Sequence, residues 1–485
     1  MVAKIIIKDE VNAKLEGLDL TTRRKLQRKF EVEVPHARFL PSVRLGRWNG
    51  KTSYFDLGGR TYVKLLEDIV PILVEENYEI ELEDHRTKYD FIFNPVTESE
   101  LSHMNWPKGH PAEGQPILLR DYQVNIINKF LGEAQCLQEI ATGAGKTIIT
   151  ATLSRKCDPY GRTLVIVPNK DLVRQTKQDY ESIGLDVGVF FGDSKQLDKT
   201  HTICTWQSLN NLFKDAKDDD EESIANIEIL LSEQIAIIVD EVHGAKADVL
   251  KQMLAGPFNH IPIRWGLTGT IPKEKHDFIN LQVCIGNVIH KVSASDLQDK
   301  GVLAQCHVSI LQLEDLKEFK NYQEELKYLV TNSDRLDKIA NLIKEANIDG
   351  NTLVLVDRLE AGTELETRIA GSIFLSGESK SDLRKEHYDE VATADNKIII
   401  ATYGIAAVGI NIPRIFNLVL IEPGKSFVRV IQSIGRGIRK AEDKDFVQIW
   451  DITSTCKFAK RHLTKRKAFY KEANYPFSVE KVDWH

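Results

Sequence analysis

The chain has 485 residues, of which 42% are apolar and 28% charged, with a net charge of −7 and an isoelectric point near 6.1. These values are typical of a soluble globular protein of about three domains. They exclude a largely disordered chain, a collagen-like repeat and a minimal disulfide scaffold. Because the overall charge is acidic, binding to nucleic acid has to be argued from local patches.

The six cysteines are far apart and none lies in a C-x-x-C pair, which disfavours a zinc finger or a dense disulfide framework. The N-terminal residues do not have the pattern of a signal peptide. No stretch reaches the roughly 18 apolar residues that a membrane span requires. We therefore expect a cytoplasmic protein with reduced thiols and no membrane partner.

Residues 1–95 form a first block with an alternating, strand-like run at 4–8 and helical patterns at 21–30 and 63–76. This order predicts a small α+β domain. Between Arg23 and Lys64 there are eleven lysines or arginines and only three acids, with aromatic residues interleaved. Basic residues beside aromatic ones suit phosphate contacts and base stacking, and a solvated basic face over core aromatics is the alternative. The candidate nucleic-acid-binding residues are Arg44, Arg47, Trp48 and Lys51.

Prolines, glycines and polar residues cluster at 96–116, which predicts a linker. From residue 117 onward, short apolar runs alternate with longer helical segments, as in parallel sheets that are covered on both faces. Examples of such runs are 164–167, 235–239, 353–356, 398–400 and 418–421. The fold class is therefore predicted to be α/β, with two further domains at 117–300 and 301–485.

The strongest motif is the glycine-rich turn 141–147, Ala-Thr-Gly-Ala-Gly-Lys-Thr, which precedes a helical segment. Backbone N–H groups of such a turn wrap a polyphosphate, and the helix N-terminus adds favourable partial charge. Lys146 is expected to reach the β- and γ-phosphates, and Thr147 to bind Mg²⁺. Ile140 stands where the general motif has glycine. The predicted ATP-binding residues here are Thr142, Gly143, Ala144, Gly145, Lys146 and Thr147.

Two acids, Asp240 and Glu241, follow the apolar run 235–239. A carboxylate at the end of a strand beside a phosphate-binding loop is well placed to anchor Mg²⁺. We assign this role to Asp240, and we assign to Glu241 the orientation or deprotonation of the attacking water. Two adjacent acids in a surface turn are the alternative, but that would not explain the phosphate motif about 95 residues earlier.

The chain resembles superfamily 2 helicases of the DExH type through eight segments in the order of that family. The first two are the glycine-rich turn and 240–243, Asp-Glu-Val-His. The others are 119–123 (Q-type motif), 167–175 (motif Ia), 205–209 (Ib), 267–270 (III), 402–413 (V) and 432–439 (VI). The resemblance implies two tandem RecA-like domains with ATP between them, and it implies that ATP hydrolysis moves the protein along nucleic acid.

Further roles follow from this resemblance alone. Arg436 and Arg439 are implied to be arginine fingers, which stabilise the charge on the transferred phosphoryl group. Arg120, Gln123, Gly409 and Gln432 are implied to contact ATP, whereas Asn411 stands where the family often has an acid. His243, Thr268 and Thr270 are implied to couple hydrolysis to nucleic-acid binding. The implied strand contacts are Lys170, Thr205, Gln207, Ser376, Gly377 and Thr402, although each serine or threonine could instead be a helix cap or turn residue.

The first block and the compact helicase core most resemble phage UvsW-type branch-migration DNA helicases. This resemblance implies sequence-independent remodelling of branched DNA, including fork regression, branch migration and unwinding of D-loops or R-loops, in the host cytoplasm. Single-strand-binding or recombination proteins are possible partners. An RNA helicase, a duplex translocase that does not separate strands, and an ATP-gated scaffold stay open. The tail 457–475 has seven basic residues and one acid, which suggests either a duplex contact or a helix that packs its aromatics on the last domain.

Overall fold

The computed structural model describes residues 1–108, 110, 112–192, 194–218, 220–242, 247–347, 350–379, 386–388, 390–391, 393–406, 412, 414–426, 433–435, 437–441 and 443–484. These residues form two compact units, 1–140 with 145–291 and 141–144 with 292–485. Within the described residues, we find no helix whose length and apolar character would allow it to cross a membrane.

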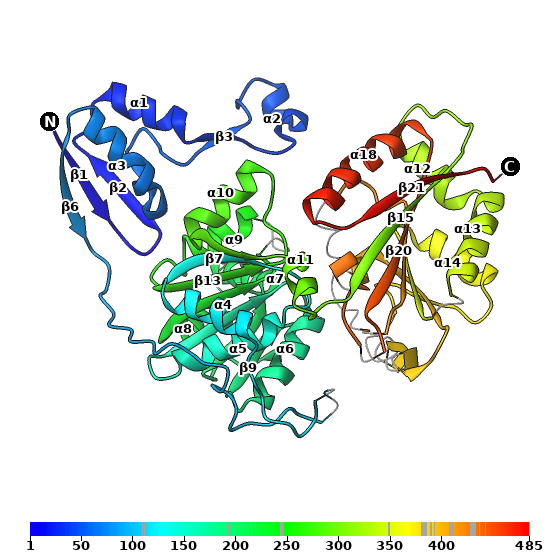
Figure 1. Ribbon diagram of the computed structural model, residues 1–485. Helices are drawn as coiled ribbons and strands as arrows, with labels where there is room; N and C mark the ends of the chain where they lie inside the picture. Colours follow the sequence, from blue (N-terminus) through cyan, green and yellow to red (C-terminus); the bar gives the residue numbers. More distant parts are fainter. Residues whose placement is uncertain are drawn as a thin grey trace. The chain divides into compact units, whose positions relative to one another are not determined.

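The first block is an α+β domain, as predicted. Its mixed sheet has the order β5-β2-β1-β6, in which β1 runs parallel to β6 and antiparallel to β2. Alternating burial along β1 sends Ala3, Ile5 and Ile7 into a core that α1 and α3 cover (Figure 1). The elements are β1 (Val2–Ile7), β2 (Asn12–Glu16), α1 (Leu20–Lys29), β3 (Glu31–Glu33), η1 (Ala37–Phe39), α2 (Pro41–Arg44), β4 (Lys51–Ser53), β5 (Arg60–Tyr62), η2 (Val63–Leu65), α3 (Leu66–Glu75) and β6 (Glu79–Asp84).

The first block is packed against the domain that follows, and the two share an apolar core. Ile279 and Val283 of α10 (Lys275–Cys284) belong to the same apolar cluster as the block's own core. The buried Tyr54 hydroxyl donates to Asn280 Oδ1 at 2.7 Å. Asn12 Nδ2 donates to the Ala255 carbonyl oxygen at 2.9 Å. The block is therefore held as one piece with the first α/β domain.

The chain between the block and residue 117 is also fixed to the first unit. The rings of Phe91 and Phe93 each make an edge contact with Tyr160, with centroids 5.4 Å apart. Asn128 bonds both the N–H and the C=O of Val96, at 2.7 and 3.0 Å. The start of the predicted linker is therefore packed against the first unit.

The first α/β sheet has the order β10-β9-β11-β8-β12-β13-β7-β14. Helices α7 to α10 contribute to the apolar core on one face, and α5 and α6 contact its strands as well. The strands are β7 (Gln135–Ile140), β8 (Arg162–Val167), β9 (Val187–Phe191), β10 (Ser194–Lys195), β11 (His201–Thr205), β12 (Gln234–Asp240), β13 (Ile263–Thr268) and β14 (Asn287–Val292). The other helices are α4 (Asp121–Leu131), α5 (Lys146–Cys157), α6 (Lys170–Ser182), α7 (Trp206–Asp215), η3 (Ala216–Asp218), α8 (Glu221–Leu231) and α9 (Ala247–Leu254).

The second α/β sheet has the order β17-β18-β16-β19-β20-β15-β21, and its paired strands are parallel. Helices α12 to α14 bury apolar side chains against one face, and α18 contacts β20. The strands are β15 (Gln305–Leu313), β16 (Thr352–Val356), β17 (Ile373–Leu375), β18 (Ile398–Thr402), β19 (Asn417–Ile421), β20 (Phe446–Ser454) and β21 (Phe477–Val482). The helices are α11 (Ala294–Asp299), α12 (Tyr322–Thr331), α13 (Ser333–Ala346), α14 (Leu359–Arg368), α16 (Tyr403–Ala406) and α18 (Lys457–Glu472).

The predicted fold class is confirmed, since both large sheets are built from the expected buried runs. The exact domain limits 1–95, 117–300 and 301–485 stay a prediction. After α18, strand β21 lies at the edge of the second sheet beside β15, and no prediction had been made for these residues.

Candidate active site

The glycine-rich turn 141–147 connects β7 to α5, as predicted. Gly145 is the N-cap of α5 and has φ 79°, a left-handed conformation that favours glycine. A Cβ at this position would lie 2.6 Å from the side-chain nitrogen of Gln123. Gln123 is buried, and its Oε1 accepts from the Arg120 N–H at 2.9 Å. Gln123, which is predicted to contact ATP, is thus packed directly against this turn.

Lys146 and Glu241 meet across the end of the first sheet. The Lys146 ammonium donates to the Glu241 carboxylate, and their side chains are only 10% and 13% exposed. Glu241 follows β12 with φ 53°, which is unusual for a residue other than glycine. Since unusual backbone geometry clusters at functional sites, this turn favours the catalytic interpretation over a plain surface loop.

The same glutamate also contacts motif III. The N–H of Gly269 donates to Glu241 Oε2 at 3.2 Å. The buried Thr268 hydroxyl donates to the Thr270 carbonyl oxygen at 2.9 Å and accepts from the Thr270 N–H at 3.2 Å. Gly269 was not among the predicted coupling residues, because its contact is made by backbone and leaves no side-chain signal. Lys146, Glu241 and motif III therefore form one connected set.

Thr147 and Asp240 supply the oxygen donors predicted for magnesium. Thr147 is the second residue of α5, and Asp240 ends β12. Both side chains are partly exposed. Among the described residues no cluster of three or more His, Cys, Asp or Glu side chains could hold a metal. A hydroxyl and one carboxylate nevertheless fit Mg²⁺, which usually binds one or two protein carboxylates together with substrate phosphates and water.

Motif VI is described at 433–435 and 437–441, where Ser433 and Ile438 are buried and Arg439 is half-buried. The backbone of Arg439 forms an antiparallel bridge with Leu303, just before β15. Four predicted site residues lie outside the described residues: His243, Gly409, Gln432 and Arg436.

The predicted strand contacts of the first unit differ in exposure. Lys170 and Gln207 are exposed at the N-terminal ends of α6 and α7. Thr205 is buried, and its hydroxyl oxygen caps α7 by accepting from the Ser208 N–H at 3.2 Å. The capping role explains Thr205 without a ligand, so its side chain carries little weight as a strand contact.

In the second unit the predicted contacts lie just after or at the ends of neighbouring strands. Ser376 follows β17, and its hydroxyl accepts from the Glu378 N–H at 3.3 Å. Gly377 is exposed, with open space where a Cβ would stand. Thr402 ends β18 and is partly exposed. The parallel pairing of β17 with β18 brings these residues to one edge of the sheet.

In the first block, residues 36–51 form a lobe between β3 and β4, which pair antiparallel. Arg44 and Arg47 are exposed on this lobe. Trp48 is partly buried and its indole N–H donates to the Lys51 carbonyl oxygen at 2.8 Å, so it closes the lobe. The Lys51 ammonium pairs with Glu31 at 3.2 Å. Phe39, one of the aromatic residues interleaved with the basic ones, is 53% exposed. Sequence reasoning missed two more exposed apolar side chains of the lobe, Leu40 and Leu45, which are 44% and 64% exposed.

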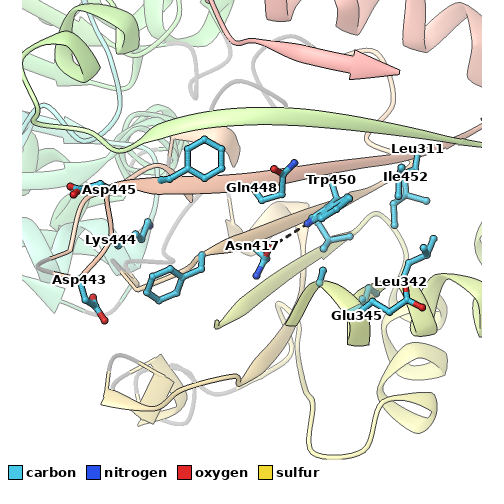
Figure 2. Close-up of a pocket in the computed structure, with 15 residues that line it drawn as sticks. Leu311, Leu342, Glu345, Asn417, Asp443, Lys444, Asp445, Gln448, Trp450 and Ile452 are labelled. Atoms are coloured by element: carbon cyan, nitrogen blue, oxygen red, sulfur yellow. Dashed lines mark hydrogen bonds between the residues drawn. The ribbon is translucent and has the colours of Figure 1, made fainter. Parts of the chain in front are cut away.

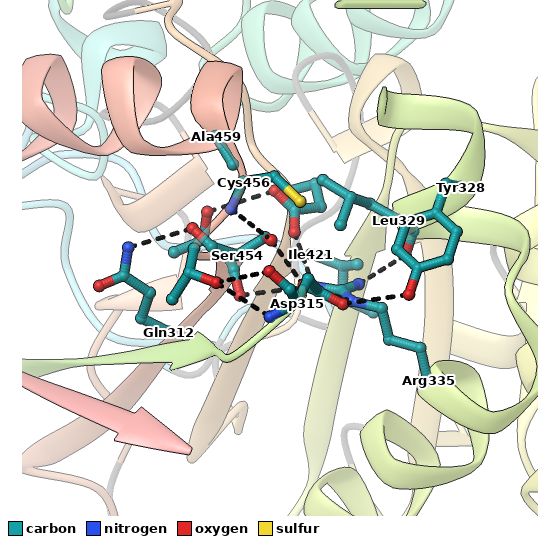
Figure 3. A network of polar contacts seen from close by, with 12 residues as sticks. Gln312, Asp315, Tyr328, Leu329, Arg335, Ile421, Ser454, Cys456 and Ala459 are labelled. Atoms are coloured by element: carbon teal, nitrogen blue, oxygen red, sulfur yellow. Dashed lines mark hydrogen bonds and ion pairs between the residues drawn. The ribbon is translucent and has the colours of Figure 1, made fainter. Parts of the chain in front are cut away.

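A buried polar network fixes the carboxyl ends of β15, β19 and β20 (Figure 3). Asp315 Oδ2 accepts from Arg335 Nε at 3.3 Å and from the Ser454 hydroxyl at 2.5 Å. Arg335 also donates to Glu422 Oε1 at 2.8 Å. Burial raises the pKa of Glu422, and the nearby Arg335 opposes that rise. Because Glu422 directly precedes the segment that leads to motif VI, the network fixes the start of that segment.

Comparisons with known proteins agree with these motifs. Residues 116–273 match the family described as the res subunit of type III restriction enzymes, and residues 334–441 match the helicase conserved C-terminal domain. The chain is 24% identical over 477 residues to the ATP-dependent DNA helicase uvsW of Enterobacteria phage T4, covering 94% of this chain and 91% of that protein. The chain belongs to the superfamily 2 helicases.

This superfamily 2 helicase is also 24% identical over 393 residues to the DNA 3′-5′ translocase XPB2 of Sulfurisphaera tokodaii, covering 71% of this chain and 83% of that one. Among solved structures, a fragment of an HsdR subunit of a Vibrio vulnificus type I restriction enzyme has a TM-score of 0.58 at 18% identity, covering 97% and 85% of the two chains. Mycobacterium smegmatis Lhr has a TM-score of 0.52 at 16% identity, covering 74% and 48%. The two tandem RecA-like domains and the prediction of an ATP-hydrolysing helicase are confirmed.

Proposed function

We propose that this helicase uses ATP hydrolysis to remodel branched DNA, such as forks, junctions and displacement loops, without reading base sequence. The observation that carries the proposal is the extent of the likeness to T4 uvsW, which covers 94% of this chain and so includes its N-terminal block. The exposed basic and apolar residues of the lobe at 36–51 suit a branch point, where phosphates and unstacked bases are both accessible.

The chemistry is assigned to the connected set at the end of the first sheet. Lys146 binds the β- and γ-phosphates, and Glu241 orients the attacking water. Magnesium, held by Thr147 and Asp240, would neutralise charge on the phosphates. Arg439, with Arg436, adds positive charge at the γ-phosphate in the transition state. The hydrogen bond between Glu241 and Gly269 couples the hydrolysis site to motif III, and through it to the segments that hold DNA.

Strand contacts are assigned to the exposed residues rather than to all those predicted. Lys170, Gln207, Gly377 and Thr402 are accessible at strand and helix ends. Lysine, polar side chains and exposed backbone hold phosphates and sugars, and they position a strand without reading its sequence. Action in the cytoplasm of a host cell and contacts with recombination proteins stay predictions.

A DNA-binding measurement tests the role of the lobe. Replacing Arg44 and Arg47 by glutamine should weaken binding to a four-way junction and lower the slope of log K against log salt by up to about 2, because each phosphate contact contributes about 0.9. The matched control replaces Lys4 and Lys14, which lie on the block's sheet and are paired with Glu83 and Glu16. Equal affinities and slopes for both double variants would contradict the proposed role.

A second candidate function is translocation on duplex DNA without strand separation, which the likeness to the XPB2 translocase favours. A strand-displacement assay on a fork, run beside a triplex-displacement assay on linear duplex, separates the two. The proposal predicts product in the fork assay. Activity in the triplex assay alone would favour the translocase. ATPase stimulation by RNA in place of DNA would favour an RNA helicase.

A further inference from the structure

Lys444 is a lysine in the second unit to which the motifs assign no role. Its side chain is 1% exposed, although lysine is among the residues that are least often fully buried. Burial lowers the pKa of its amine to about 7, with Arg439 adding to the effect and Asp443 opposing it. Because burying an amine is unfavourable, a lysine in this position calls for a reason other than stability.

The amine is bonded to motif VI itself. Lys444 Nζ donates to the carbonyl oxygen of Gly437 at 2.8 Å. Gly437 is helical and precedes Arg439 by two residues. The last carbonyls of a helix have no partner within it, and a lysine is well suited to bond them.

The loop that carries the lysine is fixed on its other sides. Lys444 and Ala441 form a backbone bridge, with the Lys444 N–H donating at 3.1 Å. The Ala304 N–H donates to the Ile438 carbonyl oxygen at 2.9 Å. Backbone bonds therefore fix the chain on both sides of Arg439, and the Lys444 side chain fixes the end of the preceding helical turn.

The charged groups around the amine already have other partners. Asp443 bonds Arg414 at 2.7 Å, and Asp445 bonds Lys440 at 2.9 Å. Lys444 also lines a cavity of about 770 Å³ beside Trp450, whose indole N–H donates to Asn417 Oδ1 at 3.4 Å (Figure 2). Glu345 of α13 lines the same cavity.

We propose that Lys444 is a positioning residue for motif VI: its bond to the Gly437 carbonyl holds the turn that presents Arg439 to the γ-phosphate. This inference rests on the proposed function, because it requires Arg439 to act on ATP. It assigns Lys444 no contact with nucleotide or DNA.

The test uses the full chain and DNA-stimulated phosphate release under single-turnover conditions. Lys444→Met should lower the hydrolysis rate at least tenfold, while the ATP concentration that gives half the maximal rate changes less than threefold. Lys440→Met, which removes an exposed lysine of the same loop, should stay within twofold of wild type. Lys444→Arg keeps a donor and a charge, and it should recover most of the lost rate.

A double variant decides whether Lys444 acts through Arg439. Lys444→Met in an Arg439→Ala background should be no slower than Arg439→Ala alone, since there is then nothing left to position. A further tenfold loss of the hydrolysis rate in the double variant would overturn the inference in favour of a general structural role. The comparison remains valid even if Lys444→Met lowers the melting temperature. A wild-type rate for Lys444→Met beside an inactive Arg439→Ala would overturn the inference but leave the proposed function intact. A wild-type rate for Arg439→Ala would instead refute the proposed role of Arg439.

Discussion

Replacing Glu241 by glutamine should separate nucleotide binding from hydrolysis. In the structure the Lys146 ammonium is bonded to the Glu241 carboxylate, and both side chains are largely buried. The phosphates of ATP have to compete with this carboxylate for Lys146. A hydrogen bond between charged groups contributes about 1.5–3 kcal/mol, compared with about 1 kcal/mol for a neutral one. Glu241→Gln should therefore favour nucleotide binding by about 1.4 kcal/mol, which is about tenfold in Kd.

Hydrolysis should fall in the same variant by about 10²–10⁴-fold, since a positioned base contributes about that much. Binding is measured by titration with ADP and with a non-hydrolysable ATP analogue, and hydrolysis by phosphate release. The matched control is Glu139→Gln, because Glu139 lies on β7 and pairs with Lys291 at 3.2 Å. If Glu241→Gln binds nucleotide no more tightly than wild type and the control, the competition between carboxylate and phosphate is refuted. Continued hydrolysis would remove the catalytic role of Glu241.

The remaining predictions concern stability. Arg466 is buried in α18 and bonds both oxygens of Asp451, at 2.8 and 2.9 Å. Arg466→Met should cost about 3–5 kcal/mol, because it leaves the buried Asp451 carboxylate without its cationic partner and with only the Tyr470 hydroxyl, which donates to Oδ2 at 2.7 Å. Lys465→Met on the exposed face should change the unfolding free energy by less than about 0.5 kcal/mol in urea titrations. The pKa of Lys444 is about 7 in the folded chain, whereas its ordinary value is 10.5. Between pH 7 and pH 10.5 the unfolded state therefore binds one more proton than the folded state. The contribution of Lys444 to the free energy of unfolding rises with pH over this range, by at most about 5 kcal/mol. The difference in melting temperature between wild type and Lys444→Met should follow that rise, and a difference independent of pH would show that the amine is not buried as described.

Much of the fold could be predicted from the sequence because buried parallel strands are continuous apolar runs. The run at 235–239 is β12, and the run at 418–421 is β19. The strand β21 was missed because its burial pattern is mostly exposed, so it has the polar character of an edge strand. The acidic residue Asp220 has a structural role that its charge alone does not indicate, because it caps α8 by accepting from the Ser223 N–H at 2.8 Å.

Candidate site residues could be predicted where a motif combines a residue type with a fixed spacing. The exposure of an individual side chain was harder to predict, because it depends on packing. The glycine-rich turn indicates a phosphate site by itself, and Gln123 proves to be packed against it. The basic tail was harder to interpret, because no count of charges shows that Arg466 is buried while Lys465 is exposed. The helical spacing of Leu463, Arg466 and Tyr470, which share the buried face of α18, is a signal that could have revealed it.

We propose that contact with branched DNA stimulates ATP hydrolysis at Lys146. The most direct measurement is the rate of phosphate release from wild type and from Lys146→Ala, with a four-way junction, a fork, linear duplex, single-stranded DNA and RNA as ligands. We expect the strongest stimulation from the junction and the fork, and no turnover by Lys146→Ala with any ligand. Turnover by Lys146→Ala at the wild-type rate, or a wild-type rate that no DNA ligand changes, would contradict it.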